Sequence, residues 1–118
     1  MIRLVFILLV ISGFGPIASA QQASAQEQLA ESRQQIDKID RQIVDLINQR
    51  AAVVNKIGEI KSAAGLPISA PGREQQVLKH VADLGVSGPF PAARLKAIYA
   101  TVLTQMREWE QEQQHSPK

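Results

Sequence analysis

The sequence contains no cysteine and only two histidines, and both shortages limit the chemistry available to it. Without cysteine the fold cannot depend on disulfide bonds. His80 and His115 lie far apart, and His115 belongs to a polar C-terminal stretch, so they form no cluster with the spacing of metal ligands. We interpret His80 as a solvated helix residue and predict no metal site.

The chain also has little excess of either charge. Lys and Arg number 13 against 11 Asp and Glu, and without residues 1–20, which include Arg3, the balance is 12 against 11. A protein that binds nucleic acid or an acidic surface needs a basic patch. We therefore expect no nucleic-acid partner.

Residues 1–20 have the composition of a secretory signal peptide. Arg3 supplies the positive charge, and residues 4–11 form the apolar run. Ala18-Ser19-Ala20 fits a cleavage site, and a second Ala-x-Ala follows at residues 23–25. A membrane anchor is the alternative, but the apolar run is short for a span. We expect an exported protein, periplasmic or secreted, with no membrane association after cleavage.

Glycine and proline are almost absent between residues 30 and 63, where Gly58 is the single exception. Apolar residues recur there at helical spacing, as they do in two later segments, and no segment shows the alternation of a strand. We predict an all-α fold of one long, one short and one medium helix, over residues 30–63, 72–84 and 91–113. The predicted organisation is a signal peptide (1–20), a flexible leader (21–29), a helical domain (30–113) and a polar tail (114–118).

The predicted long helix carries an apolar stripe that is longer than the other two helices of the chain can cover. At the standard rise its length is about 50 Å, well beyond that of the other two helices. A domain of this size already buries a small share of its surface. An intertwined homodimer, with the long helices side by side, would cover the exposed stripe. A solitary coiled coil is the alternative, and the apolar stripe of the third helix argues against it.

Several charges lie where the helical periodicity would place apolar residues. Arg50 occupies a heptad row that isoleucine otherwise fills, and Arg33 and Lys61 extend a second, partly apolar row at its two ends. Glu110 lies on the apolar stripe of the third helix, and Glu74 shares a face with apolar residues of the short helix. A buried charge without a partner is unfavourable, so we expect each of these residues to reach water, pair with an opposite charge or bind a ligand.

Two interpretations of these charges remain open. Arg and Lys can extend from an apolar seam into water, and Arg50 can pair with Glu74 or Glu110 as an internal salt bridge. Alternatively, the charges bind a ligand. Together with Arg73, the set has four cations and two carboxylates, and its positive excess suits a small polyanion whose carboxylates would take bidentate Arg pairing.

Three segments carry a family resemblance: "IDKIDRQIVDLINQRAAVVNKIGEIK", "GLPISAPGREQQVL" and "GPFPAARLKAIYATVLTQMREWE". They resemble the all-helical, AroQ-type (type II) chorismate mutases, and especially the mutase domain joined to prephenate dehydratase in many bacteria. The similarity covers about residues 33 to 110. It implies a domain-swapped helical homodimer, in agreement with the argument from helix length.

The resemblance also implies which residues form the site. The catalytic residues would be Lys61, Glu110 and Arg50, within a substrate-binding set of Arg33, Arg50, Lys61, Ala70, Arg73, Glu74, Met106 and Glu110. Arg33 of the second subunit and Arg50 would bind the two substrate carboxylates. Lys61 and Glu110 would face the ether oxygen of the breaking bond, and Glu74 would bind the ring hydroxyl.

Three further positions qualify this assignment. Arg73 would support the pocket. Ala70 stands where many members of the family have Asp, and Met106 where many have Ser. Both departures put the affinity for substrate in doubt more than the type of reaction.

The implied activity is the conversion of chorismate to prephenate in the Phe/Tyr branch of aromatic amino acid biosynthesis. The reaction is a [3,3] rearrangement, for which the resemblance implies no metal and no cofactor. An isochorismate pyruvate-lyase shares the same frame and is one alternative. A non-catalytic exported helical dimer is the other, favoured by Ala70 and Met106 and opposed by the retained cations.

Glu110 leads to a hypothesis about pH. An ionised carboxylate would repel negative charge that develops on the ether oxygen, whereas a protonated one would donate a hydrogen bond. We expect activity to be highest on the acid side of neutral and expect Glu110→Gln to relieve this dependence. The alternative is that Lys61 neutralises Glu110, which then stays ionised.

Overall fold

The computed structural model describes residues 16–116, with side chains from residue 19 onward, as three α-helices without a strand. The helices are α1 (Pro16–Ala64), α2 (Pro71–Gly85) and α3 (Ala92–His115). The predicted all-α class and the three helices are therefore confirmed. Within the described residues, none of these helices has the length and apolar character that crossing a membrane requires.

Local chemistry explains where the helices begin and end. Gly65 adopts a left-handed conformation with φ of 66°, and the amide of Leu66 donates to the carbonyl of Lys61 at 2.8 Å. This arrangement is the usual glycine-terminated end of a helix. Pro71 occupies the first turn of α2, where its missing N–H costs nothing and its fixed φ suits the helix. Pro91 directly precedes α3.

The N-terminal part of α1 differs from expectation. Residues 21–29, predicted as a flexible leader, are helical in the structure. Their alanine, glutamine and glutamate side chains have high helix propensity, and adding turns to an existing helix avoids the cost of nucleation. Of the predicted signal peptide, residues 1–15 lie outside the described residues. Of the predicted polar tail, residues 117 and 118 also lie outside them, while α3 continues to His115.

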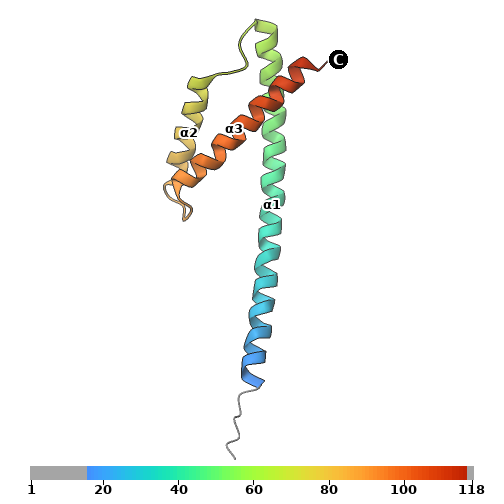
Figure 1. Cartoon of the computed structure of the whole chain (residues 1–118), viewed down its shortest axis with the longest axis vertical. Coiled ribbons are helices and arrows are strands. Elements are labelled where there is room, and N and C mark those ends of the chain that lie inside the picture. The colour runs from blue at the N-terminus through green and yellow to red at the C-terminus, as the bar shows by residue number, and fades with distance from the viewer. Residues whose placement is uncertain (1–15, 117–118) are drawn as a thin grey trace, which may run out of the picture. The chain divides into compact units, whose positions relative to one another are not determined.

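The chain divides into two compact units, residues 1–43 and residues 44–118. In the first unit, the described residues belong to the N-terminal part of α1, and their side chains are exposed. The second unit contains residues 44–64 of α1 together with α2 and α3. There α2 and α3 run antiparallel and pack against each other, and α3 crosses the C-terminal part of α1 (Figure 1).

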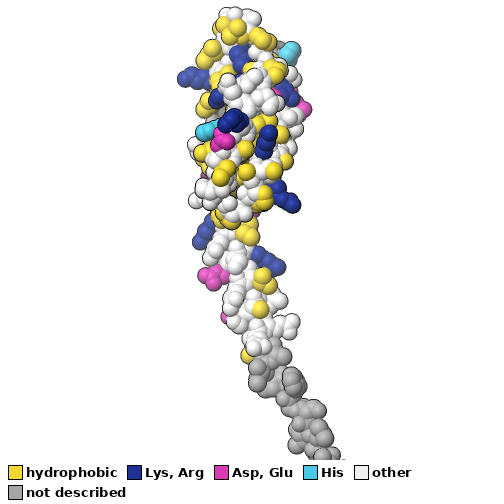
Figure 2. Space-filling model, turned by 90° about the vertical axis from the view of Figure 1, so that its left-hand side faces the viewer, with side chains coloured by type: hydrophobic (Ala, Val, Ile, Leu, Met, Phe, Trp, Pro, Cys, Tyr) yellow, Lys and Arg dark blue, Asp and Glu magenta, His cyan; other side chains and the backbone are white. Residues whose placement is uncertain are grey.

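The core of the second unit is small. Its buried apolar side chains are Val81, Leu103 and Met106, and Glu110 is buried beside them. Gly85 allows α2 to approach α3 closely, because a Cβ at this position would lie 2.5 Å from Leu95 Cδ1. Hydrophobic side chains remain visible on the surface of this unit, with Lys and Arg between them (Figure 2).

Candidate active site

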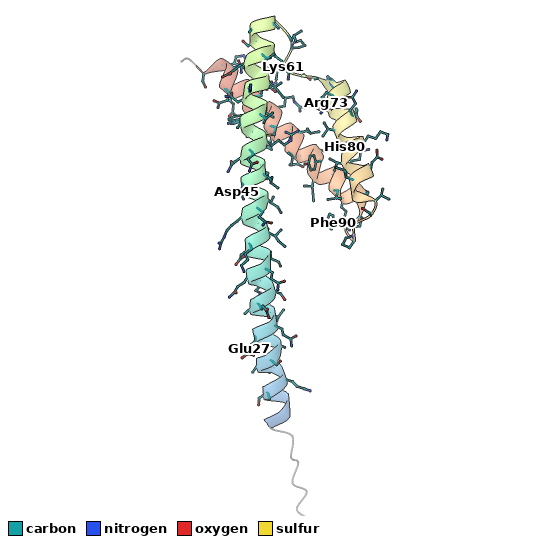
Figure 3. The ribbon with its side chains drawn as sticks, turned by 180° about the vertical axis from the view of Figure 1, so that it is seen from behind. Glu27, Asp45, Lys61, Arg73, His80 and Phe90 are labelled. Carbon is teal, nitrogen blue, oxygen red and sulfur yellow. The ribbon has the colours of Figure 1, made fainter. Side chains whose placement is uncertain are left out.

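A pocket in the second unit lies between the C-terminal part of α1, the loop that follows it, and both other helices. Its volume is about 220 Å³. Figure 3 shows Lys61 on α1 and Arg73 at the start of α2, both at this end of the unit, whereas Phe90 lies at the turn at the far end of α2. The lining residues are Arg50, Val54, Ile57, Lys61, Ile68, Ala70, Arg73, Glu74, Val77, Leu103, Met106, Arg107 and Glu110.

Helical spacing explains how the charged residues reach this pocket. On α1, Arg50 and Lys61 stand eleven residues apart, close to three turns, so both lie on the face that also carries Ile57. On α3, Leu103 and Glu110 stand seven residues apart, close to two turns, and also share a face. The apolar residues between the charges keep this face packed inward.

Lys61 and Glu110 form the most buried ion pair among the described residues. Lys61 Nζ lies 3.1 Å from Glu110 Oε1, and their side chains are 19% and 6% exposed. Lys61 Nζ also donates to the carbonyl of Ile68 at 2.8 Å. Gly58 makes room for the pair, because a Cβ there would lie 3.1 Å from Glu110 Cγ. Two of the three Lys61 donors therefore have protein partners, and the ammonium keeps one further donor.

A second ion pair closes the end of the pocket formed by α2. Arg107 Nη1 on α3 donates to Glu74 Oε1 in the first turn of α2, and both side chains are about 70% buried, with 30% and 29% exposed. The carboxylate also lies at the positive end of the helix, which favours an anion there. The pair thus links α3 to the start of α2.

The other two cations of the pocket have no such partner. Neither Arg50 nor Arg73 forms an ion pair within residues 16–116. With Lys61 matched by Glu110, and Arg107 by Glu74, the lining residues carry an excess of two positive charges. Two guanidinium groups without carboxylates suit a ligand that has two carboxylates of its own.

The family model for "Chorismate mutase type II" matches residues 32–111, which include every lining residue of this pocket. This chain belongs to the chorismate mutase type II family. The predicted similarity to the mutase domain of a bifunctional chorismate mutase/prephenate dehydratase is confirmed.

Curated relatives support this membership of the chorismate mutase family. The chain is 41% identical over 81 residues to the bifunctional chorismate mutase/prephenate dehydratase of Aquifex aeolicus, covering 66% of this chain and 22% of that protein. It is 40% identical over 58 residues to the chorismate mutase of Methanocaldococcus jannaschii, covering 49% of this chain and 59% of that protein. The matched region therefore spans less than two thirds of either relative.

Solved chorismate mutases share the fold. The enzyme of Helicobacter pylori, determined in complex with prephenate, aligns with a TM-score of 0.70 and 27% identity, covering 78% of this chain and 99% of that one. Form II of the Thermus thermophilus enzyme aligns with a TM-score of 0.67 and 25% identity, covering 71% of this chain and 94% of that one.

The pocket brings together most of the residues that the chorismate mutase resemblance singled out. These are Arg50, Lys61, Ala70, Arg73, Glu74, Met106 and Glu110. Arg33 is not among them: it belongs to the first unit and its side chain is exposed. The internal salt bridge considered for Arg50 does not form, because Glu74 pairs with Arg107 and Glu110 pairs with Lys61.

Sequence reasoning missed Arg107. The signal was present, because Arg107 follows Leu103 by four residues and precedes Glu110 by three, which places it on the same face of α3. Met106 lies one position before Arg107 and also lines the pocket. The family resemblance singled out Met106 and not Arg107.

The two departures from the family pattern both lie in the pocket. Ala70 precedes the first turn of α2 and makes no side-chain capping hydrogen bond. Met106 is 8% exposed and fills space with an apolar side chain. These positions supply no hydrogen-bonding groups of their own, so the polar side chains of this pocket are its six charged residues.

Proposed function

We propose that this chain catalyses the rearrangement of chorismate to prephenate. The observation that carries the proposal is the pairing pattern of the pocket. Lys61 and Glu110 form an ion pair within it, while Arg50 and Arg73 line it without a carboxylate partner among the described residues. Chorismate is a dicarboxylate, so it would supply the missing anions.

Binding would bring the reacting ends of the substrate together. Arg50 would hold one carboxylate, Arg33 of the partner subunit would hold the other, and Arg73 would support the pocket. The side chain of chorismate must lie over the ring before the bonds can exchange, and holding a reactive conformer removes much of the entropic barrier. The [3,3] shift breaks the C–O bond and forms the C–C bond within one molecule, so no covalent intermediate arises.

Electrostatic stabilisation would supply the rest of the rate enhancement. Negative charge builds on the ether oxygen as the C–O bond breaks, and a preorganised donor near that oxygen lowers the barrier. Lys61 fits this role, because its other donors are fixed by Glu110 and by the carbonyl of Ile68. Glu110 would face the same oxygen, and Glu74 would accept a hydrogen bond from the ring hydroxyl.

We also propose that two chains form an intertwined homodimer. Apolar residues along α1 are largely exposed in the single chain; Ile39, Ile43, Leu46 and Ile60 are 53%, 48%, 61% and 58% exposed. Exposed apolar surface of this extent is typical of an interface. A second copy would cover it and would bring its own Arg33, which does not line the pocket of its own chain, to the site. Sedimentation of the purified protein tests the dimer.

We further propose that residues 1–20 direct export and are removed, leaving the mature chain in the periplasm or outside the cell. The argument is the pattern of Arg3, the apolar run and the Ala-x-Ala cleavage site. The mass of the protein recovered from a fractionated expression host tests this proposal. An unprocessed chain in the cytoplasmic fraction would contradict it.

The function is tested with purified protein that begins at Gln21. Chorismate loss is followed by absorbance and prephenate is identified as product, with Arg50→Met as the active-site variant. Lys79→Met serves as the control, because Lys79 pairs with Asp83 at 2.7 Å on the exposed face of α2 and does not line the pocket. Rapid loss in the parent and the control but not in Arg50→Met supports the mutase.

Two other results would point elsewhere. A folded, dimeric protein that does not accelerate chorismate loss would contradict the proposed activity. Conversion of isochorismate to salicylate and pyruvate by the same protein would instead support the lyase. If neither substrate reacts, the chain is a non-catalytic member of the family.

A further inference from the structure

Arg107 is the pocket cation for which neither the sequence resemblance nor the proposed mechanism supplies a role. It lies on α3 between Met106 and Glu108, and its Nη1 donates to Glu74 Oε1. Its side chain is 30% exposed, so the guanidinium is only partly shielded from solvent. Its single ion-pair partner within the described residues is the carboxylate at the start of α2.

We propose that Arg107 is a positioning residue that holds Glu74 for recognition of the substrate's ring hydroxyl; this inference rests on the proposed function. The Arg107 hydrogen bond occupies Glu74 Oε1 and leaves Oε2 as an acceptor. A glutamate at a partly exposed position would otherwise sample several rotamers. Fixing the carboxylate before the substrate arrives lowers the entropic cost of binding.

The composition of the rest of the pocket makes this contact important. Ala70 lies at the same end of the pocket and has no hydrogen-bonding side chain, and Glu110 is already bound to Lys61. Glu74 is therefore the one lining carboxylate left for a hydroxyl at this end. Its orientation decides how well the ring hydroxyl is recognised.

Arg107 also keeps Glu74 away from the cations that the substrate needs. Arg50 and Arg73 line the same pocket without carboxylate partners. Without Arg107, Glu74 would be free to pair with one of these guanidinium groups, because they line the same pocket. The substrate carboxylate would then have to displace Glu74 before it bound.

A double-mutant cycle on kcat/KM tests the proposal. Arg107→Gln is expected to lower kcat/KM for chorismate about tenfold, the scale of one charged hydrogen bond, mainly through a higher KM. Arg107→Lys keeps the cation and is expected to stay within about threefold of the parent. In a Glu74→Gln background, adding Arg107→Gln should change kcat/KM less than about twofold, because the interaction it serves is already gone.

The readouts separate a positioning role from a merely structural one. Urea unfolding midpoints are measured for every variant, and Arg107→Met removes the cation in the same cycle if Arg107→Gln fails to fold. Two results with an active parent would contradict the role of Arg107 and leave the proposed function intact. One is that the losses of kcat/KM from Arg107→Gln and Glu74→Gln are additive, and the other is that Arg107→Gln keeps kcat/KM within about twofold of the parent. A parent enzyme inactive on chorismate would contradict the proposed function and this inference together.

Discussion

Arg50→Met should separate catalysis from stability. Arg50 is half-buried and forms no ion pair in residues 16–116, so its replacement breaks no salt bridge of the chain. The methionine side chain preserves most of the apolar stem of the arginine. We expect the free energy of unfolding to change by less than about 1 kcal/mol. We expect kcat/KM for chorismate to fall by about two to three orders of magnitude, within the range seen when one partner of a buried, hydrogen-bonded charge pair is truncated.

The assay combines chorismate loss with urea denaturation on the same preparations. Lys79→Met provides the matched control: it removes an exposed cation whose pKa is raised by a hydrogen bond and by charge attraction from Asp83. This control should keep the activity of the parent. A loss in Arg50→Met below about threefold would refute the assignment of Arg50 to a substrate carboxylate. Destabilisation above about 2 kcal/mol would show that Arg50 has a structural partner instead.

Four further substitutions test the surroundings of the Lys61–Glu110 pair. Lys61→Met should lower the free energy of unfolding by about 3 kcal/mol in urea, because it leaves the buried Glu110 without a cation. Adding Glu110→Gln to this variant should recover much of the lost stability. Unchanged stability in Lys61→Met would show that the ion pair does not stabilise the fold. Glu110→Gln should flatten a parent pH–rate profile in which activity is highest on the acid side of neutral; a parent profile already flat from acid to neutral pH would contradict this. Gly58→Ala should cost about 1 kcal/mol in thermal or urea unfolding, because its Cβ would lie 3.1 Å from Glu110 Cγ, whose carboxylate is held by Lys61; unchanged stability would show that the Glu110 side chain moves aside freely. Ala70→Asp should raise the free energy of unfolding in urea by about 1 kcal/mol, because the carboxylate would cap the N-terminus of α2. A destabilised variant would show that the carboxylate does not reach the free amides of the first turn.

The helices were predictable because their signals are local. Glycine and proline separate the three segments, and in the structure Gly65 directly follows the end of α1 and Pro71 begins α2. The start of α1 was wrong by about four turns, because residues 21–29 have a composition that suits both a polar leader and an extension of an existing helix. Propensity alone does not decide between these states, since helix formation depends on what precedes the segment.

Several charged residues of the pocket were predictable because charges on an apolar face are unusual. Glu110 was expected on the buried stripe of α3 and is 5% exposed. Lys61 and Arg50 were expected on the inward face of α1 and line the pocket. Periodicity identifies such residues without knowledge of the tertiary structure, because it depends on the turn of a single helix.

The pairing of these charges was not predictable, because pairing depends on how one helix is rotated against another. The sequence allowed Glu74 of α2 to pair with Arg50 of α1 or with Arg107 of α3. Nothing in the residue spacing favoured either partner. In the structure α2 packs against α3, and the first turn of α2 lies beside Arg107. Because Glu74 pairs with Arg107, Arg50 has no ion-pair partner within residues 16–116. If Glu74 paired with Arg50 instead, Arg107 would lose its carboxylate, and the excess of two positive charges in the pocket would lie on Arg73 and Arg107.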